Sequence, residues 1–265
     1  QETWHHLTSQ PGGILLVTGP TGSGKTTTLY TKLKQLATPE VNVCTIEDPI
    51  EMVDPRLNQL QVNHDIDLTF ATGVRALMRQ DPDIIMVGEI RDGETADMAI
   101  QAALTGHLVL STLHTNDAPS AVTRLLDLGA PAYLLSATLL GIMAQRLVRT
   151  LCPHCKVKTP FQREEDHATW NALCAPFKAP PPAEVARPTG CLECRNTGYL
   201  GRVGIYEILP LTLELKRLLV SEPDLGTLTQ AAYKAGMRPL RVSGAMKVAQ
   251  GITTIEEVLK AAPLV

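Results

Sequence analysis

The sequence of 265 residues has few aromatic side chains, no excess of positive charge and no long apolar run. Phe, Trp and Tyr make up 4% of the chain, so its core must rest on Leu, Ile, Val, Ala and Met. The formal net charge of −3 provides no electrostatic footprint for nucleic acid. No apolar run approaches the roughly 20 residues that a membrane-spanning helix needs. With 44% hydrophobic residues, the composition is that of a globular protein with a sizeable core.

The chain also lacks an initial Met and a secretory signal, since it opens with Gln1, Glu2, Thr3 and Trp4. Residues 9–13 (SQPGG) break any helix, and residues 1–12 are therefore predicted to be a linker. A phosphate-binding pattern follows almost at once. We expect an upstream portion of the protein to be missing.

The clearest pattern is a strand, a glycine-rich loop and a helix in that order. Residues 14–18 are apolar and favour a strand, and Leu29 and Leu33 recur at helical spacing after the loop. The loop fits the G-x-x-x-x-G-K-[ST] pattern, whose glycines turn backbone N–H groups toward anionic oxygens. Here Lys25 is expected to reach the β- and γ-phosphates, and the Thr26 hydroxyl to be a ligand of Mg²⁺. The predicted nucleotide-binding residues are Gly19, Pro20, Thr21, Gly22, Ser23, Gly24, Lys25, Thr26 and Thr27.

Strands alternate with helices as far as residue 151, which predicts an α/β core with a mostly parallel sheet and helices on both faces. Helices are expected at 118–128 and 131–143, followed by an outer strand at 145–151. Helical periodicity disappears over 152–197. The predicted domains are a nucleotide-binding core at 1–151, an inserted segment at 152–197, and a returning strand with a C-terminal helical bundle at 198–265.

Acidic residues follow two of the predicted strands. Glu47, Asp48 and Glu51 follow one strand, and Glu89 follows another. Ligands of open α/β sheets bind at the carboxyl ends of the strands, so these acids are expected to face the nucleotide. Taken alone, three acids in five residues also fit a solvated turn. Beside a phosphate loop, we predict Glu51 as the catalytic base and Glu89 as support for Mg²⁺ or its water shell.

Two histidines and two arginines are further candidates. His107 and His114 flank a predicted strand at an odd spacing, so a regular strand would direct them to opposite faces. His114, near the carboxyl end, is the favoured phosphate sensor, whereas His107 fits a structural hydrogen bond equally well. Arg75 and Arg79 lie four apart in a predicted helix at 69–79. Both fit ordinary surface residues. The alternative is that at least one of them is a phosphate ligand.

Four of the six cysteines form two C-x-x-C pairs separated by 35 residues. Two such pairs in a stretch with little apolar periodicity favour a tetrahedral structural zinc site over disulfides. Four thiolates leave no open position for catalysis, and the metal is expected to hold a segment that has little core of its own. Cys44 and Cys174 fit reduced, buried cysteines instead. The predicted zinc ligands are Cys152, Cys155, Cys191 and Cys194.

Four ordered motifs closely resemble those of the ATPases of type II secretion and type IV pilus machineries. They are GPTGSGKTT at 19–27, TIEDPIE at 45–51, RQDPDIIMVGEIRD at 79–92 and TGHLVLSTLHT at 105–115. In that family they are the Walker A, Asp box, Walker B and His box motifs, in that order.

The resemblance implies roles for individual residues. Glu51 corresponds to the catalytic glutamate of the Asp box, and Glu89 to the Walker B glutamate. His107 and His114 correspond to the His-box pair, while Arg75 and Arg79 match positions that approach phosphate in relatives.

The resemblance also implies a function: a cytoplasmic ATPase motor at the inner face of the bacterial inner membrane, with ATP, Mg²⁺ and Zn²⁺ as cofactors. The family forms a homo-hexameric ring. It meets inner-membrane secretion-platform proteins through an N-terminal domain that this chain lacks, so membrane association is expected only through partners. Nucleic acid is not an expected partner.

Within the family, the tetracysteine module separates pilus-assembly and type II secretion ATPases from retraction ATPases. The stretch at 121–149 looks closer to the type II secretion members. The preferred prediction is therefore a motor for pseudopilus assembly and protein export, with type IV pilus assembly as the alternative. Two alternatives of other classes are a zinc-containing nucleic-acid motor or binder, and a non-enzymatic scaffold stabilised by nucleotide and zinc.

Overall fold

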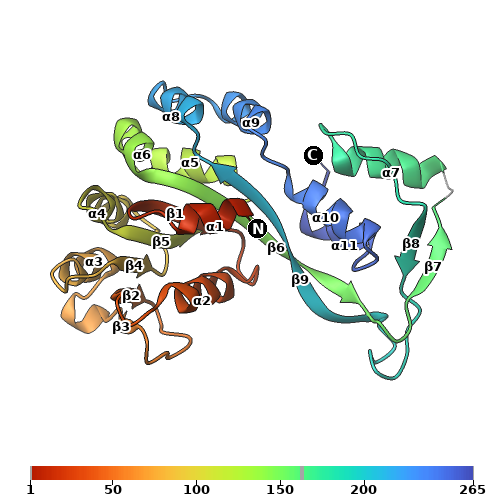
Figure 1. Cartoon of the computed structure of the whole chain (residues 1–265), viewed down its shortest axis with the longest axis horizontal. Helices are drawn as coiled ribbons and strands as arrows, with labels where there is room; N and C mark the ends of the chain where they lie inside the picture. Colours follow the sequence, from red (N-terminus) through yellow and green to blue (C-terminus); the bar gives the residue numbers. More distant parts are fainter. Residues whose placement is uncertain (1, 162–163, 265) are drawn as a thin grey trace. The chain divides into compact units, whose positions relative to one another are not determined.

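The computed structural model describes residues 2–161 and 164–264, and the chain divides into two compact units (Figure 1). Unit 1 comprises Gln1–Ala144 and Ile208–Met237, and unit 2 comprises Gln145–Glu207 and Arg238–Val265. The chain passes between the units three times: within the long strands β6 (Leu139–Leu151) and β9 (Tyr199–Pro210), and again between residues 237 and 238. The predicted divisions are at 151/152 and 197/198, where the segment that contains the two C-x-x-C pairs begins and ends.

The core of unit 1 is a mostly parallel sheet, as predicted. The order across the sheet is β3 (Asn58–Gln61), β2 (Val43–Glu47), β4 (Ile84–Val87), β5 (Leu108–Leu113), β1 (Gly13–Thr18), β6 and β9. Neighbouring strands in this order pair in parallel from β3 as far as β6. Every residue of β1, β2, β4 and β5 is buried, as expected for strands covered on both faces.

Helices cover both faces of this sheet, which confirms the predicted fold class. On one face, α1 (Glu2–Thr8) and α2 (Lys25–Leu36) share an apolar cluster with alternate residues of the strands, among them Leu15 and Val17. On the other face, Gly73 of α3 (Phe70–Leu77) lies so close to Ile46 that an added Cβ would come within 2.8 Å of that side chain. Helix α4 (Gly93–Leu104) packs beside α3.

Residues 2–8 and 131–143 of unit 1 differ from their predicted structure. Residues 2–8, predicted as linker, form α1. The predicted helix at 131–143 is wrong beyond residue 138, because α6 (Ala132–Thr138) ends there and β6 begins. Residues 139–143 are a short apolar run, which periodicity cannot assign, and their parallel pairing with β1 makes them a strand. The preceding helix, α5 (Ala118–Asp127), agrees with the predicted helix at 118–128. A short 3₁₀ turn, η1 (His64–Ile66), follows β3.

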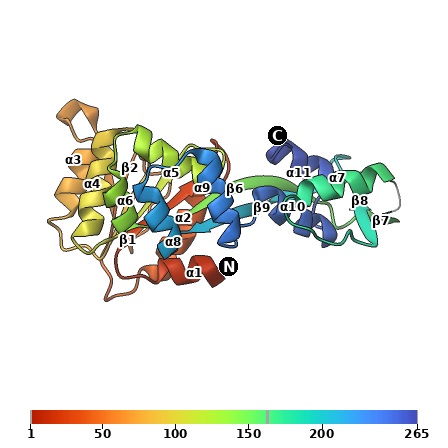
Figure 2. The same cartoon turned by 90° about the horizontal axis from the view of Figure 1, so that it is seen from above.

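The predicted C-terminal helical bundle is divided between the units. Helices α8 (Leu213–Val220) and α9 (Leu225–Lys234) belong to unit 1, where they pack against α6 and α5 respectively (Figures 1 and 2). Helices α10 (Leu240–Ala249) and α11 (Ile255–Ala261) belong to unit 2. Among the described residues, no helix combines the length and apolar character that spanning a membrane requires.

Unit 2 has a core, which the sequence analysis did not expect. Within 152–197 lie β7 (Val157–Pro160), α7 (Glu164–Cys174) and β8 (Glu184–Arg187), which pairs antiparallel with β7. Trp170 is 1% exposed and packs with Val185, Val248 and other apolar residues of this unit. Helix α7 has few apolar residues and a polyproline-prone segment follows it, so the pattern was too weak to reveal this core.

Candidate functional site

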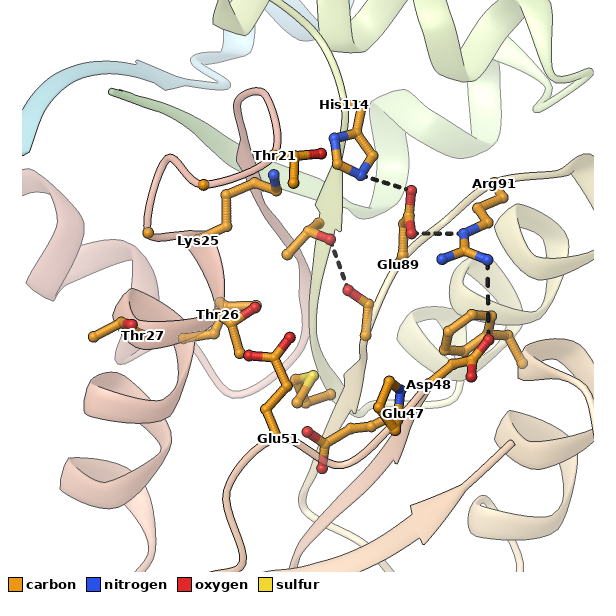
Figure 3. A pocket seen from close by; sticks show the side chains of 18 residues that line it. Thr21, Lys25, Thr26, Thr27, Glu47, Asp48, Glu51, Glu89, Arg91 and His114 are labelled. Atoms are coloured by element: carbon orange, nitrogen blue, oxygen red, sulfur yellow. Dashed lines mark hydrogen bonds and ion pairs between the residues drawn. The ribbon is translucent and has the colours of Figure 1, made fainter. Parts of the chain in front are cut away.

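The glycine-rich loop joins β1 to α2 and closes on its own lysine. Gly22 and Gly24 have φ values of 79° and 84°, in the left-handed region that favours glycine, and Gly24 caps α2. The Lys25 side chain is buried, and its Nζ donates hydrogen bonds to the carbonyls of Gly19 at 2.8 Å and Pro20 at 3.0 Å. The ammonium group therefore lies at the mouth of the loop, where it faces the adjoining pocket (Figure 3).

A pocket of about 470 Å³ opens at the carboxyl ends of the parallel strands. It brings together residues that are distant in sequence, as the order of strand ends predicted. Gly19, Pro20 and Ser23 belong to the same loop but do not line this pocket. The predicted residues that line it are Thr21, Gly22, Gly24, Lys25, Thr26, Thr27, Glu51, Glu89 and His114.

Glu89, two residues after the end of β4, has a partner for each carboxylate oxygen. His114 Nε2 lies 3.0 Å from Oε1, and Arg91 Nε donates to Oε2 at 2.6 Å (Figure 3). Arg91 also lies 3.9 Å from Asp48 and stacks over the ring of Phe70. These contacts fix the orientation of Glu89 at the pocket wall.

Arg91 is a pocket residue that the sequence analysis missed. The sequence does contain one signal for it: Arg91 lies two positions after Glu89, within the Walker B motif at 79–92. An alternation of acid and base over so few residues is common on surfaces. Only the structure shows that Arg91 joins Glu89 to Asp48 of a neighbouring strand end.

Glu47 is buried and anchored, although it belongs to the same acidic motif as Glu51. Tyr30 OH donates a hydrogen bond to its Oε1, and Thr45 Oγ1 donates to its Oε2 at 2.7 Å. Gln59 Nε2 donates to the same Oε2 at 3.1 Å. Burial, and then the hydrogen bond to Glu47, raise the pKa of Tyr30 well above its usual range, so its hydroxyl stays a donor. Glu47 is thus committed to the wall of the pocket.

Glu51 differs from Glu47 in having no anchor of its own. Its side chain is exposed, and within the described residues it makes no hydrogen bond or ion pair. Figure 3 shows the carboxylate directed toward Thr26, across the pocket from Glu89. An unengaged carboxylate beside the phosphate loop is available for a water molecule.

The two histidines lie at opposite ends of β5. His114 follows the carboxyl end and reaches the pocket, whereas His107 precedes the amino end. His107 Nδ1 lies 2.8 Å from the carbonyl of Ala102 and 3.0 Å from Thr105 Oγ1. The structure therefore brings His114, and not His107, to this pocket.

The two arginines do not share a helix or a pocket position. Helix α3 ends at Leu77, so Arg79 lies beyond it and the predicted four-residue spacing along one helix is wrong. Both side chains are exposed, and Arg75 Nη2 lies 3.8 Å from the sulfur of Met98. Neither lines the pocket formed by the described residues.

The four cysteines of the C-x-x-C pairs converge in unit 2. Their sulfur atoms lie within 4.8 Å of one another, with Cys152–Cys191 and Cys155–Cys194 at 3.8 Å and Cys191–Cys194 at 3.7 Å. A tetrahedral metal with bonds of about 2.3 Å to sulfur sets sulfur–sulfur edges of about 3.8 Å. The donor set therefore fits a tetrahedral thiolate site in both chemistry and size.

Backbone N–H groups also favour thiolates at this cluster. The amides of Cys191 and Gly198 each donate to Cys194 Sγ at 3.2 Å, and that of Gly190 donates to Cys155 Sγ at 3.3 Å. Burial opposes ionisation, but the amides outweigh it and lower the pKa of Cys194 to about 6. Burial raises the pKa of Cys152 to about 11. These hydrogen bonds favour the thiolate form of the cysteines, which is the form that binds a metal.

Comparisons with known proteins find a matching family and several similar proteins. Residues 1–260 match the family described as type II/IV secretion system protein. The type IV pilus assembly ATPase TfpB of Acinetobacter baylyi is 61% identical over 98% of this chain and 44% of its own length. The type II secretion system protein HxcR of Pseudomonas aeruginosa is 51% identical, over 96% of this chain and 50% of its own length. The type II secretion system ATPase E of Vibrio cholerae is 49% identical, over 98% of this chain and 50% of its own length.

A solved structure shares the fold. The pilus retraction motor PilT with bound ADP superimposes with a TM-score of 0.72 and 29% identity, over 99% of this chain and 65% of its own. The chain thus spans about half the length of the curated relatives it matches.

Proposed function

The chain belongs to the type II/IV secretion system protein family, and from that membership we propose that it is the ATP-hydrolysing part of a bacterial secretion or pilus motor. One observation carries the proposal: Lys25, Thr26, Glu51, Glu89 and His114 come from four different strand ends and line a single pocket. Each of them has the chemistry that γ-phosphate hydrolysis uses.

Nucleotide binding is assigned to the loop at 19–27. Its backbone N–H groups and the N-terminus of α2 attract phosphate oxygens. Lys25 Nζ exchanges two neutral carbonyl acceptors for anionic oxygens, which form stronger, charge-assisted hydrogen bonds. Thr26 would hold Mg²⁺ through its hydroxyl, and the ion would neutralise charge on the phosphates when bound.

Hydrolysis is assigned to Glu51, with support from Glu89. The Glu51 carboxylate orients a water molecule and accepts its proton as the water oxygen attacks the γ-phosphorus, which releases ADP and phosphate. Glu89 is held by His114 and Arg91, so it is suited to orienting a neighbouring group rather than to taking the proton itself. We assign His114 the part of reporting the γ-phosphate to Glu89, since its ring contacts Glu89 and lines the same pocket as the phosphate loop.

The four cysteines are assigned a structural zinc ion. Thiolates in a closed tetrahedral set suit Zn²⁺ and leave no position for a reacting water. The ion would fix the two C-x-x-C turns at the end of β6 and before β9.

For the cellular role, two proposals stand. The preferred one is the energising of pseudopilus assembly and protein export by a type II secretion system, at the cytoplasmic face of the inner membrane and as a ring of six copies. HxcR and the Vibrio cholerae ATPase support it. Type IV pilus assembly is the second candidate, favoured by the 61% identity with TfpB.

The activity is tested with Lys25→Ala and Glu51→Gln in the intact protein. We expect Lys25→Ala to lose both ATP binding and turnover. Glu51→Gln should bind a fluorescent ATP analogue at the wild-type affinity and lose at least about 100-fold in kcat, because only the water loses its partner. The matched control is Asp97→Asn, an exposed carboxylate on α4 outside the pocket.

Near-normal turnover in both variants would refute the ATPase proposal, and stimulation of turnover by single-stranded DNA would favour a nucleic-acid motor. Deletion of the gene in the source bacterium then separates the two cellular roles. Loss of secreted enzymes with intact surface pili supports type II secretion, and the reverse supports pilus assembly.

A further inference from the structure

Two glutamines of the edge strand β3 contact the backbone on both sides of Glu51. Gln61 Oε1 accepts a hydrogen bond from the N–H of Ile50 at 3.0 Å, just before Glu51. Gln59 Nε2 donates to the carbonyl of Met52 at 2.8 Å, just after it. The sequence analysis gave neither glutamine a role.

The strand geometry explains why both glutamines face this loop. They are two residues apart on β3, so their side chains leave the same face. In the parallel register Gln59 lies opposite Thr45 and Gln61 opposite Glu47 of β2, the strand that leads into the Glu51 loop. The face that contacts the loop is therefore set by the pairing of β3 with β2.

The Gln59 amide joins the buried wall of the pocket to the loop. Its Oε1 accepts from the N–H of Asp54 at 2.9 Å, while its Nε2 donates to Met52 and also to Glu47 Oε2 at 3.1 Å. A backbone N–H on one side and a backbone carbonyl on the other leave one orientation for this amide. Gln59 thus holds two points of the loop against an anchored glutamate.

The far end of the loop is also fixed. The Asp54 side chain is 6% exposed and accepts hydrogen bonds from Arg56 Nε at 3.0 Å and Nη2 at 2.8 Å. Between the fixed points the tip is open, with Val53 83% exposed. Because Glu51 has no side-chain partner of its own, its position follows from the backbone that the glutamines hold.

We propose that Gln59 and Gln61 are positioning residues that keep the Glu51 carboxylate at the phosphate loop. This proposal rests on the proposed function of Glu51 as the catalytic base. Misplacing a catalytic group by about 1 Å costs up to about 100-fold in rate, so modest release of this loop is expected to lower turnover measurably. Gln59 carries the larger share, because its hydrogen bonds with Asp54 and Glu47 are partly buried, whereas that of Gln61 is exposed to water.

The first test compares kcat and KM for Gln59→Met and Gln61→Met in the intact protein. We expect kcat to fall about tenfold and about threefold respectively, with KM for ATP unchanged, because the phosphate loop is not altered. The matched control is Asn58→Leu on the same strand, which loses an amide hydrogen bond to Asn42 instead of one to the loop. The control should retain the wild-type kcat.

A second test separates positioning from a general loss of stability. Gln61 acts only as an acceptor, so Gln61→Glu should restore the wild-type rate. Gln59→Glu should not, because it removes the donor to Met52 and brings a second carboxylate against Glu47. In a Glu51→Gln background, measured by single-turnover hydrolysis of radiolabelled ATP, Gln59→Met should cause no further loss.

Two outcomes would overturn the proposal: a wild-type kcat in Gln59→Met, or the same tenfold loss with and without Glu51. A wild-type kcat in Glu51→Gln alone would instead refute the proposed function. The two failures are therefore distinguishable.

Discussion

The pocket of unit 1 and the cysteine cluster of unit 2 gather side chains from distant parts of the chain in different ways. The pocket residues follow strands whose apolar core is complete without them, so the sheet places the chemistry. The cysteines extend from turns, and their sulfur atoms lie where the turns meet. We therefore expect substitutions in the pocket to lower the ATPase rate more than the stability of the fold. Substitutions in the cluster should lower stability more than the ATPase rate.

The largest expected effect follows removal of Cys194, one of the four proposed zinc ligands. Cys194→Ser should remove bound zinc and destabilise unit 2 by several kcal/mol, since structural zinc contributes about 10 kcal/mol or more in small domains. Trp170 lies in unit 2 and Trp4 in unit 1. Thermal unfolding in a Trp4→Phe background, followed by Trp170 fluorescence, should therefore show the loss.

The control for this prediction is Cys174→Ala, which changes a buried cysteine outside the cluster. It should retain one zinc per chain. With Trp170→Phe and Trp4 as the reporter, Cys194→Ser should leave unit 1 stable. Equal destabilisation at both tryptophans would break the contrast between the two regions.

The next largest effect concerns Glu89 and tests whether a substitution in the pocket lowers activity without lowering stability. Glu89→Gln keeps the shape of the side chain but removes the charge that Arg91 and His114 contact. We expect kcat to fall about 100-fold, which is about 2.7 kcal/mol, with a melting temperature close to that of the wild type. Steady-state kinetics and calorimetry on the same samples measure both. A large drop in melting temperature would show that this glutamate also supports the fold.

A third prediction concerns pH and unit 2. The Arg149 side chain contacts Glu257 at 2.5 Å, and this hydrogen bond lowers the pKa of Glu257 in the folded protein. A lowered pKa stabilises the fold above the unfolded pKa of about 4.3, and that contribution disappears as the pH falls through the folded pKa.

Glu257→Gln should therefore cost about 1.5–2 kcal/mol at pH 7. The difference from the wild type should shrink below about pH 4.3, as measured by urea unfolding across a pH series. Glu256→Gln, an exposed neighbour, is the control and should show little difference at either pH. A constant difference across the series would exclude the ion pair as the cause.

The smallest effects separate the two histidines. His114→Asn should lower kcat about tenfold because it removes one partner of Glu89. His107→Asn should leave kcat within about twofold and cost about 1 kcal/mol of stability, through the lost contact with Ala102. ATPase rates and urea midpoints for both variants test this. Loss of turnover in His107→Asn would place that residue in a site that this single chain does not form.

Much of unit 1 and its site was readable from the sequence because the signals were local. The glycines within the loop at 19–27 supply the backbone conformation that the loop needs. Apolar runs followed by acidic residues mark the ends of strands, and these ends meet at one edge of a parallel sheet. The C-x-x-C spacing likewise picked out the four cysteines that converge in the cluster. In each case neighbouring residues contain the whole signal.

What only the tertiary structure decided depends on pairings between distant segments. The strand at 139–143 exists because β1 pairs with it, and the core around Trp170 exists because α10 and α11 supply its other half. Glu47 and Glu51 look alike in sequence, yet burial against Tyr30 and Gln59 anchors one and leaves the other free for chemistry. The sequence determined which groups reach the pocket edge, and packing determined which of them remained available, because burial and hydrogen bonding depend on neighbours that no local pattern contains.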